Sequence, residues 1–263
     1  MPQSQSSTYP FPPASPSQSP VPISDLFFNL ANASTVSISS YKISQNNEIE
    51  NSTGGVVWES SYLLYDYLSA SLKEEDRTLA VISDGPGLLS MCLSTFFTSV
   101  IATEIGSVVP LLSSNITSNN LSSKVTVTPH DWTVPWSSPR SSLVLTTDTL
   151  FSSSLVIPLL STLKLALLPH GTVYICSQER CLDSIAKLIT EGPEYFDDFR
   201  EVSEEVWEVV DWGREVGGRV WRGRGKADVN LKKRKKEKRE KKEKKEKKEK
   251  KEKKEKKHKK NEP

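Results

Sequence analysis

The residues best suited to chemistry begin with a glycine-rich turn inside the run LAVISDGPGL, residues 79–88. Its apolar first half predicts a buried strand, the glycines a tight turn, and the residues after them a helix. Glu104 then closes a second apolar segment. Such a turn lets the backbone approach a nucleotide, and a carboxylate at the end of the next strand accepts hydrogen bonds from ribose hydroxyls. The spacing predicts a nucleoside pocket, although the same turn also occurs in α/β proteins that bind nothing there.

Further polar and aromatic side chains fall at or beside the ends of other predicted strands. They are Trp58 just before the first helix, Asp131 and Trp132 after the third strand, Thr147 and Asp148 after the fourth, and residues 178–180 after the fifth. The carboxyl ends of parallel strands meet at one edge of a sheet, where open α/β sheets bind ligands. We therefore expect these side chains to lie close together.

Apolar strands alternate with amphipathic helices through the centre of the chain. Strands are expected at 79–83, 99–104, 124–128, 142–147 and 171–177, and helices from about Trp58 to Leu72 and at 88–97, 107–118, 155–167 and 181–191. Strands separated by helices of this length imply right-handed crossovers. We expect a Rossmann-like, mainly parallel, doubly wound sheet in three α/β/α layers, with a short strand or hairpin near residues 35–43 outside it.

The two ends of the chain differ in composition from the centre. Residues 1–22 are rich in Pro, Ser and Gln, and such a segment cannot bury enough apolar surface to become ordered. We therefore expect a disordered leader over residues 1–22, one domain over residues 23–225, and a Lys/Glu repeat tail over residues 226–263.

The tail reverses the charge of the body. From Lys232 to Pro263 there are 21 Lys or Arg and 8 Glu, a net charge of +13, whereas residues 1–231 carry a net −11 and the whole chain +2. Dense lysine attracts phosphate without reading sequence, so we expect the tail to contact RNA, ribosomes or acidic proteins, or to support nuclear import. The alternative is a charged tail that only keeps the protein in solution.

The cysteines and the apolar segments exclude several classes of protein. Cys92, Cys176 and Cys181 fit neither an even set of disulfides nor the paired spacing of a zinc site. We interpret Cys92 and Cys176 as small core residues, and we expect a reducing compartment and no metal. No segment resembles a membrane span or a signal peptide. The expected protein is a monomer of the cytoplasm without membrane contact, with the nucleus as a second location.

Taken together, the motifs resemble those of the seven-strand, class I S-adenosylmethionine-dependent methyltransferases. The resemblance is to the nicotinamide N-methyltransferase-like branch, which contains the protein-lysine methyltransferases, among them fungal elongation-factor methyltransferases. It runs from about Gly54 to Arg180 and rests on these motifs in the family's order: Gly55 to Trp58, Ser83 to Gly87, Glu104, residues 111–119 with their asparagines, Asp131-Trp132, Asp148 to Phe151, and Gln178 to Arg180.

The resemblance implies a role for each of these residues toward S-adenosyl-L-methionine and a substrate. Glu104 is implied to hold the ribose hydroxyls, Trp132 to pack against adenine, and Asp148 to act at the substrate entrance, where it orients the lysine amine. The other cofactor-binding residues that it implies are Trp58, Ser83, Asp84, Gly85 and Gly87 near the methionine part, and Thr147 through its backbone near the sulfonium.

Each residue also has a purely structural interpretation. Trp58 and Trp132 could be core aromatics. Glu104 could be an acid stabilised by the dipole of the next helix, and Asp148 could cap the helix that follows it.

The chain departs from the family pattern in the turn and in the acidic motif. Val81 stands where the family has an acid, Ser83 replaces the first glycine, Pro86 stiffens the turn, and Phe151 replaces a tyrosine. A serine that must adopt a positive φ is strained, and its Cβ narrows the approach to the backbone, so we expect weaker cofactor binding.

The C-terminal part of the domain is harder to predict. Residues 195–210 fit either a helix or an edge strand. Residues 217–225 are rich in Gly and Arg and are expected to leave the globular part. The last two strands of the family sheet are then missing, which leaves an exposed sheet edge.

The sequence therefore predicts an S-adenosyl-L-methionine-dependent protein-lysine N-methyltransferase that acts on a non-histone protein such as a translation elongation factor. The alternative is a catalytically weakened methyltransferase fold that serves as a binding or scaffold protein through its basic tail. A small-molecule N-methyltransferase is a third hypothesis, because one fold serves both kinds of substrate.

Overall fold

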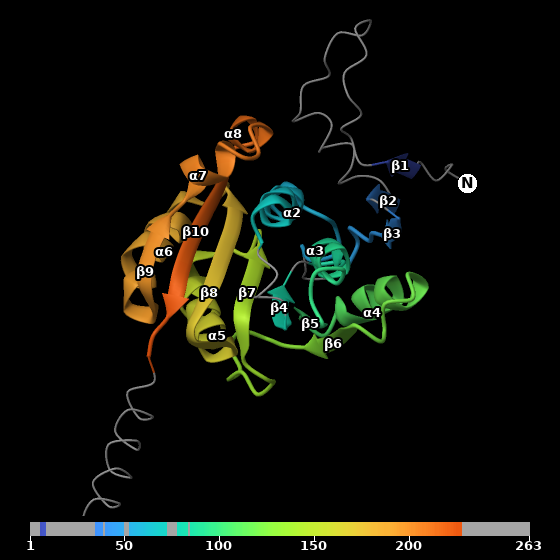
Figure 1. The fold of residues 1–263 in the computed structure, drawn as a ribbon, viewed down its shortest axis with the longest axis horizontal. Coiled ribbons are helices and arrows are strands. Elements are labelled where there is room, and N and C mark those ends of the chain that lie inside the picture. The colour runs from blue at the N-terminus through green and yellow to red at the C-terminus, as the bar shows by residue number, and fades with distance from the viewer. Residues whose placement is uncertain are drawn as a thin grey trace, which may run out of the picture. The chain divides into compact units, whose positions relative to one another are not determined.

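The computed structural model describes residues 6–8, 35–38, 40–49, 53–72, 78–83 and 85–227 (Figure 1). Within the segment expected to be a leader, residues 6–8 form the short strand β1 (Ser6–Thr8). The rest of residues 1–22, and the tail from residue 228 onward, lie outside the described residues.

A seven-stranded sheet forms the centre of the domain. Its strands are β4 (Leu79–Ser83), β5 (Ser99–Glu104), β6 (Val125–Pro129), β7 (Ser141–Thr147), β8 (Leu167–Gln178), β9 (Phe196–Glu201) and β10 (Gly218–Gly225). They lie in the order β6-β5-β4-β7-β8-β10-β9. The first five in this order are parallel, whereas β10 pairs antiparallel with both β8 and β9. The expected Rossmann-like sheet is confirmed.

Helices cover both faces of this sheet (Figure 1). They are α2 (Glu59–Ser71), α3 (Leu88–Leu93), α4 (Val109–Ser118), α5 (Val156–Ala166), α6 (Leu182–Tyr195), α7 (Ser203–Trp207) and α8 (Trp212–Glu215), with a 3₁₀ turn η2 (Ser153–Leu155) before α5. None of the helices in the described part of the chain has both the length and the apolar character that a membrane crossing needs.

Two hydrophobic cores follow from the alternation of side chains along each strand. Along β4, Ala80 and Ile82 face a core shared with α2, α3 and α4, while Val81 faces a core shared with α5 and α6. The three expected α/β/α layers are therefore present. The strands and helices predicted from the apolar pattern all occur, and their largest shifts are the earlier end of α3 at Leu93, the earlier start of β8 at Leu167 and the later end of α6 at Tyr195.

The expectation that residues 217–225 leave the globular part is wrong. This segment is β10, and the undecided region before it forms β9 and α7, so the sheet has both antiparallel strands. The glycines allow close packing, because a Cβ on Gly225 would lie 2.1 Å from the Leu168 carbonyl oxygen. Between the glycines of β10, Val220 and Trp221 are 0% and 1% exposed. Glycine often ends a strand, but here it permits a strand inside the sheet.

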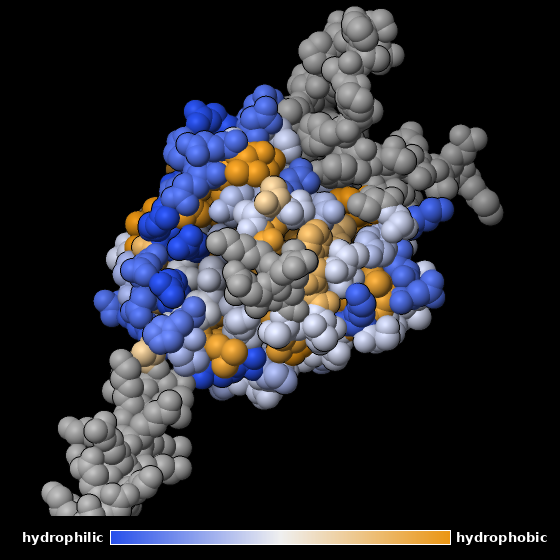
Figure 2. Space-filling view, in the orientation of Figure 1, coloured by the Kyte–Doolittle hydropathy of each residue, from blue (hydrophilic) through white to orange (hydrophobic). Residues whose placement is uncertain are grey.

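The outer edge of the completed sheet is protected by charge. Strand β9 has the sequence FDDFRE, and Asp197, Asp198 and Arg200 are exposed. Figure 2 shows hydrophilic side chains gathered on the side of the molecule that carries β9 and β10. Charged side chains on an edge strand discourage pairing with another chain.

A small second sheet is held against α4 by two asparagine side chains. Its strands β2 (Thr35–Ile38) and β3 (Tyr41–Ser44) form the antiparallel pair expected outside the main sheet. Asn115 donates to the Ser44 carbonyl at 2.9 Å and accepts from the Ser44 N–H at 2.9 Å. Asn119 makes the same two bonds with Lys42, at 2.7 and 3.0 Å. Each carboxamide thus gives β3 one donor and one acceptor, as the backbone of a neighbouring strand would.

The cysteines lie where the apolar pattern predicts. Cys92 and Cys176 are buried in the core that contains α2, and all three cysteines, including the half-buried Cys181, are free thiols. Burial raises the pKa of the Cys176 thiol well above its ordinary value. A buried thiol of this kind is unreactive, as expected of a small core residue.

Replacing Trp221 with Ala tests whether β10 is a core strand. We expect the free energy of unfolding in urea to fall by about 3–5 kcal/mol, because the change removes a fully buried indole. The control is Arg224→Ala on the same strand, where the side chain is 48% exposed and the loss should stay below about 1 kcal/mol. Equal, small losses for the two variants would contradict the assignment of residues 218–225 to the sheet.

Candidate functional site

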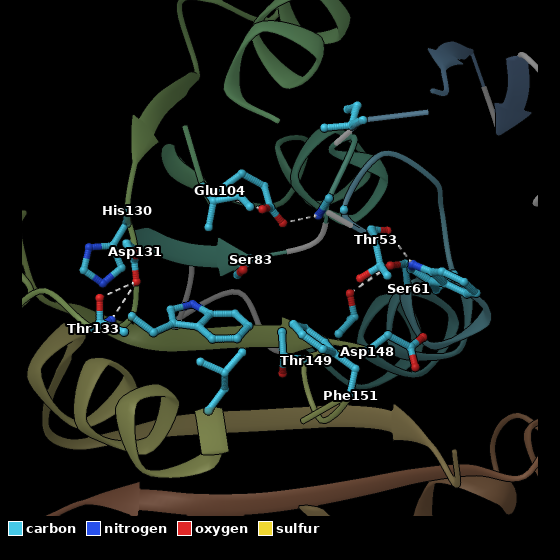
Figure 3. A pocket seen from close by; sticks show the side chains of 18 residues that line it. Thr53, Ser61, Ser83, Glu104, His130, Asp131, Thr133, Asp148, Thr149 and Phe151 are labelled. Carbon is cyan, nitrogen blue, oxygen red and sulfur yellow. Dashed lines mark hydrogen bonds between the residues drawn. The ribbon is translucent and has the colours of Figure 1, made fainter. Parts of the chain in front are cut away.

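A cavity of about 500 Å³ opens at the carboxyl ends of β4, β5 and β7 (Figure 3). Its lining includes most of the residues predicted from sequence, namely Trp58, Ser83, Gly85, Glu104, Trp132, Thr147 and Asp148. Gly87 does not line it, and Asp84 lies outside the described residues. The structure thus brings together side chains that are far apart in the sequence.

The turn after β4 depends on two glycines with positive φ. Gly85 has φ 66° and Gly87 has φ 102°, in the region that favours glycine. A Cβ on Gly85 would lie 2.8 Å from the Gly54 carbonyl oxygen, so the turn packs directly on the segment before α2. A Cβ on Gly87 would lie 2.6 Å from the Leu112 side chain, which assigns Gly87 to packing below the cavity.

The strain expected at Ser83 is not found. Among the described non-glycine residues only Asn120, Asp148, His170 and Asp198 have positive φ, and Ser83 is the last residue of β4. The left-handed positions fall on the two glycines after it. The strain part of the argument for weakened cofactor binding is therefore wrong, whereas the narrowing of the approach by the Ser83 Cβ stays a prediction.

Glu104 connects the end of β5 to the glycine turn. One carboxylate oxygen accepts the Gly85 N–H at 3.0 Å, and the other accepts the Ile105 N–H at 3.0 Å. α4 begins only at Val109, and its N-cap has no side-chain hydrogen bond, so Glu104 does not cap it. Glu104 also lines the cavity, and a carboxylate is a group that accepts hydrogen bonds from hydroxyls.

Trp132 forms an aromatic wall and is positioned by its neighbours. Asp131 accepts hydrogen bonds from the Thr133 N–H at 2.8 Å and the Thr133 hydroxyl at 2.7 Å, and these bonds lower the pKa of Asp131. The Trp132 ring lies 6.3 Å from the ring of Phe151, which is 52% exposed. Beside them, burial lowers the pKa of His130, whose ring nitrogen lies 3.2 Å from the Thr162 hydroxyl.

Asp148 combines a strained backbone with a deeply buried carboxylate. Its φ is 51°, its side chain is 4% exposed, and its Oδ1 accepts the Gln178 N–H and an Arg180 N–H, both at 3.1 Å. Its Oδ2 is buried and has no hydrogen-bond partner among the described residues. No side-chain hydrogen bond caps η2 or α5, so Asp148 does not cap the next helix. A buried unpaired carboxylate oxygen calls for a functional explanation.

The start of α2 brings further groups to the same wall. Trp58 donates from its indole to the Thr53 carbonyl at 3.1 Å, and the Arg180 guanidinium lies 4.3 Å from the centre of its ring. The Ser61 hydroxyl lies 2.9 Å from that of Thr147, which ties α2 to the end of β7.

Sequence reasoning missed Glu59, Ser61 and Thr149. Glu59 directly follows Trp58 and is the acid of the first turn of α2, a pattern that could have drawn attention to it. Ser61 and Thr149 carry no such signal, because an isolated hydroxyl residue has no spacing to identify it.

The arrangement suits an elongated ligand. Glu104 offers a carboxylate for hydroxyls at one part of the wall, and Asp148 offers a carboxylate at another part (Figure 3). Trp132 adds a flat apolar face to the lining. The described residues contain no group of three or more His, Cys, Asp or Glu side chains placed to hold a metal ion.

Solved structures with the same fold are distant in sequence. The T. thermophilus 16S rRNA N2 G1207 methyltransferase RsmC, in complex with AdoMet and guanosine, is 17% identical with a TM-score of 0.52; the match covers 71% of this chain and 47% of that chain. PigF with SAH is 10% identical with a TM-score of 0.50, over 62% of this chain and 55% of that chain. The S-adenosylmethionine-dependent methyltransferase SibL is 15% identical with a TM-score of 0.49, and the match covers 64% of this chain and 56% of that chain. The chain thus spans about half the length of these proteins.

The sequence comparisons give a family. No curated protein sequence matches the chain significantly. A family model described as lysine methyltransferase matches residues 38–196, more than half of the chain, including the glycine turn, Glu104, Trp132, Asp148 and Arg180. On this match, the chain belongs to the lysine methyltransferase family.

Proposed function

We propose that this protein is an S-adenosyl-L-methionine-dependent protein-lysine N-methyltransferase. Membership of the lysine methyltransferase family supports the class of reaction. The observation that carries the proposal is the presence of Glu104 and the buried Asp148 on the wall of one cavity. The first carboxylate suits a nucleoside and the second suits a cationic side chain.

The cavity fits the cofactor in size and in chemistry. Its volume of about 500 Å³ lies within the range of small-molecule sites. Glu104 would hold the ribose hydroxyls, Trp132 would pack against adenine, and Ser83 and Gly85 would lie along the methionine part. Thr147 and Trp58 line the remaining wall. When bound, S-adenosyl-L-methionine supplies a methyl group on a positively charged sulfur.

Asp148 is the residue that would orient the substrate. A lysine side chain arrives as an ammonium ion and must lose a proton before its nitrogen can accept a methyl group. Asp148, whose buried Oδ2 has no hydrogen-bond partner among the described residues, would accept one N–H of that ammonium and fix its direction. The proton then leaves to water, and the neutral amine stays aligned beside the cofactor pocket.

The substrate and the location are further parts of the proposal. We propose a lysine on another protein, with a translation elongation factor as the first target to test, in the cytoplasm and also the nucleus. The scaffold alternative retains the replacements in and before the turn, at Val81, Ser83 and Pro86, and that at Phe151. It loses the expected strain at Ser83 and the expected absence of the last two strands. Incubating a cell lysate with this protein and a radioactive methyl donor, then identifying the labelled band, tests the target directly.

Replacing Glu104 with Ala tests the ribose site. We expect the dissociation constant for S-adenosylhomocysteine, measured by calorimetry, to rise about tenfold or more, because hydrogen bonds to a charged group are lost. Glu104→Gln keeps an acceptor for the Gly85 N–H and should lose less. Glu194→Ala, at the exposed C-terminal end of α6, controls for the loss of one negative charge. Unchanged affinity in Glu104→Ala would place the ribose elsewhere, and no binding by the unaltered protein at millimolar ligand would remove the enzyme hypothesis.

Replacing Asp148 with Asn separates substrate orientation from cofactor binding. Asn has the same shape and tolerates the positive φ at this position. We expect methyl transfer to the labelled target to fall about 100-fold, while the dissociation constant for S-adenosylhomocysteine changes less than about twofold. Asp197→Asn, on the exposed edge strand, is the control. Full activity in Asp148→Asn would exclude a role for this carboxylate in orienting the amine.

Truncation after Leu231 tests the proposed role of the tail. It removes a net charge of +13, so association with RNA or ribosomes should be lost, and in the full chain that association should weaken steeply with salt. Co-sedimentation at two salt concentrations measures both effects. An association that survives truncation would mean that the tail does not make the contact.

A further inference from the structure

A cluster of four side chains beside the cavity combines two carboxylates, one cation and an aromatic face. The Arg180 guanidinium lies 2.7 Å from Glu59 Oε2 and 3.1 Å from Asp148 Oδ1, and 4.3 Å from the centre of the Trp58 ring. Trp58 and Asp148 also line the cavity, whereas Glu59 and Arg180 do not. The cluster therefore joins the cavity to the surface.

Two carboxylates and an aromatic face form the environment that proteins use to bind an organic cation. Trp58 and Glu59 come from the start of α2, while Asp148 follows β7, so the surrounding groups are held by separate elements. Burial raises the pKa of Glu59 above its ordinary value, and the charge of Arg180 opposes this rise. The cluster therefore contains two acidic side chains against the single guanidinium of Arg180.

Arg180 uses only part of the hydrogen-bonding capacity of the two carboxylates. It reaches Asp148 through Oδ1, an oxygen that already accepts the Gln178 N–H, and leaves the buried Oδ2 without a partner. It makes one bond to each carboxylate instead of the paired bonds that a guanidinium can form. An ammonium group is more compact and carries three N–H donors.

Arg180 is also the member of the cluster that can leave. Its side chain is 41% exposed, against 16% for Glu59 and 4% for Asp148, so solvent can replace its contacts on one side. Ion pairs of an exposed side chain are weak because water screens them and because a long side chain must be held in place. The buried carboxylates stay, and the exposed guanidinium can move.

We propose that Trp58, Glu59 and Asp148 form a cation-binding cage for the alkylammonium group of the substrate, and that Arg180 occupies this cage as an internal stand-in. The inference rests on the proposed function, because it assigns the cage to the substrate lysine. Arg180 then competes with the incoming ammonium and must swing outward before the lysine reaches Asp148.

Binding of n-butylammonium, a model of the lysine side chain, to the full-length protein tests the cage. The indole N–H signal of Trp58 in NMR spectra reports binding, and Trp58→Phe identifies that signal among the Trp residues. If Arg180 leaves the cage free only about one-tenth of the time, the unaltered protein binds n-butylammonium about tenfold more weakly than a protein whose cage is always free. We therefore expect Arg180→Ala to lower the dissociation constant about tenfold. Neutral n-butanol should bind no better to Arg180→Ala than to the unaltered protein.

Three further variants make the outcome decisive. Arg180→Lys keeps a competing cation and should behave like the unaltered protein, while Arg180→Gln should behave like Arg180→Ala and replaces it if that variant fails to fold. Adding Asp148→Asn to Arg180→Ala should remove the gain. Equal or weaker binding in both Arg180→Ala and Arg180→Gln would overturn the proposal, because Arg180 would then support the site and not occupy it.

The result is independent of the proposed methyl transfer. If S-adenosylhomocysteine binds but the affinity for n-butylammonium does not depend on Arg180, the cage is wrong and the proposed function stands. If n-butylammonium binding rises in Arg180→Ala while S-adenosylhomocysteine does not bind, the site still binds an organic cation, but its assignment to a substrate lysine fails together with the proposed function.

Discussion

The site depends on how the turn after β4 is held in place. Its backbone takes up left-handed conformations at Gly85 and Gly87, and two side chains from outside the turn fix it there. Glu104 accepts the Gly85 N–H at 3.0 Å, and Asn115 donates to the Pro86 carbonyl at 2.9 Å. Because Asn115 also binds β3, the second sheet, the turn and the end of β5 form one connected unit. The floor of the cavity is therefore set by hydrogen bonds that span the domain.

Much of the fold follows from the apolar pattern. Strand β4 is predicted with its observed ends because its first four residues are apolar and a Gly-rich turn follows Ser83. The location of the site follows as well, since residues at the carboxyl ends of parallel strands must meet. Strand β10 could not be predicted in this way, because repeated Gly usually marks turns and loops. Only the packing of Leu168 against Gly225 and the burial of Trp221 show why a strand is stable there.

The contacts inside the site were the least predictable part. The resemblance suggested which residues line the cavity, but it gave no indication that Arg180 connects Glu59 to Asp148. Such a contact depends on the path of three separate segments, and no spacing in the sequence encodes it. The two carboxylates in the cavity also differ: both Glu104 oxygens have partners, whereas Asp148 has one that does not. Glu104 therefore holds the turn, while the buried Oδ2 of Asp148 is the acceptor to which we propose that the substrate amine binds.

The position of β10 determines the order in which the nascent chain can finish folding. β10 lies between β8 and β9 but is synthesised after both of them. Until Gly218–Gly225 emerges, the edges of β8 and β9 that β10 later occupies are unpaired, and such edges invite pairing with other polypeptides. The parallel half of the sheet, with the nucleoside side of the cavity, can assemble before this moment, and the insertion of the last strand then closes the domain.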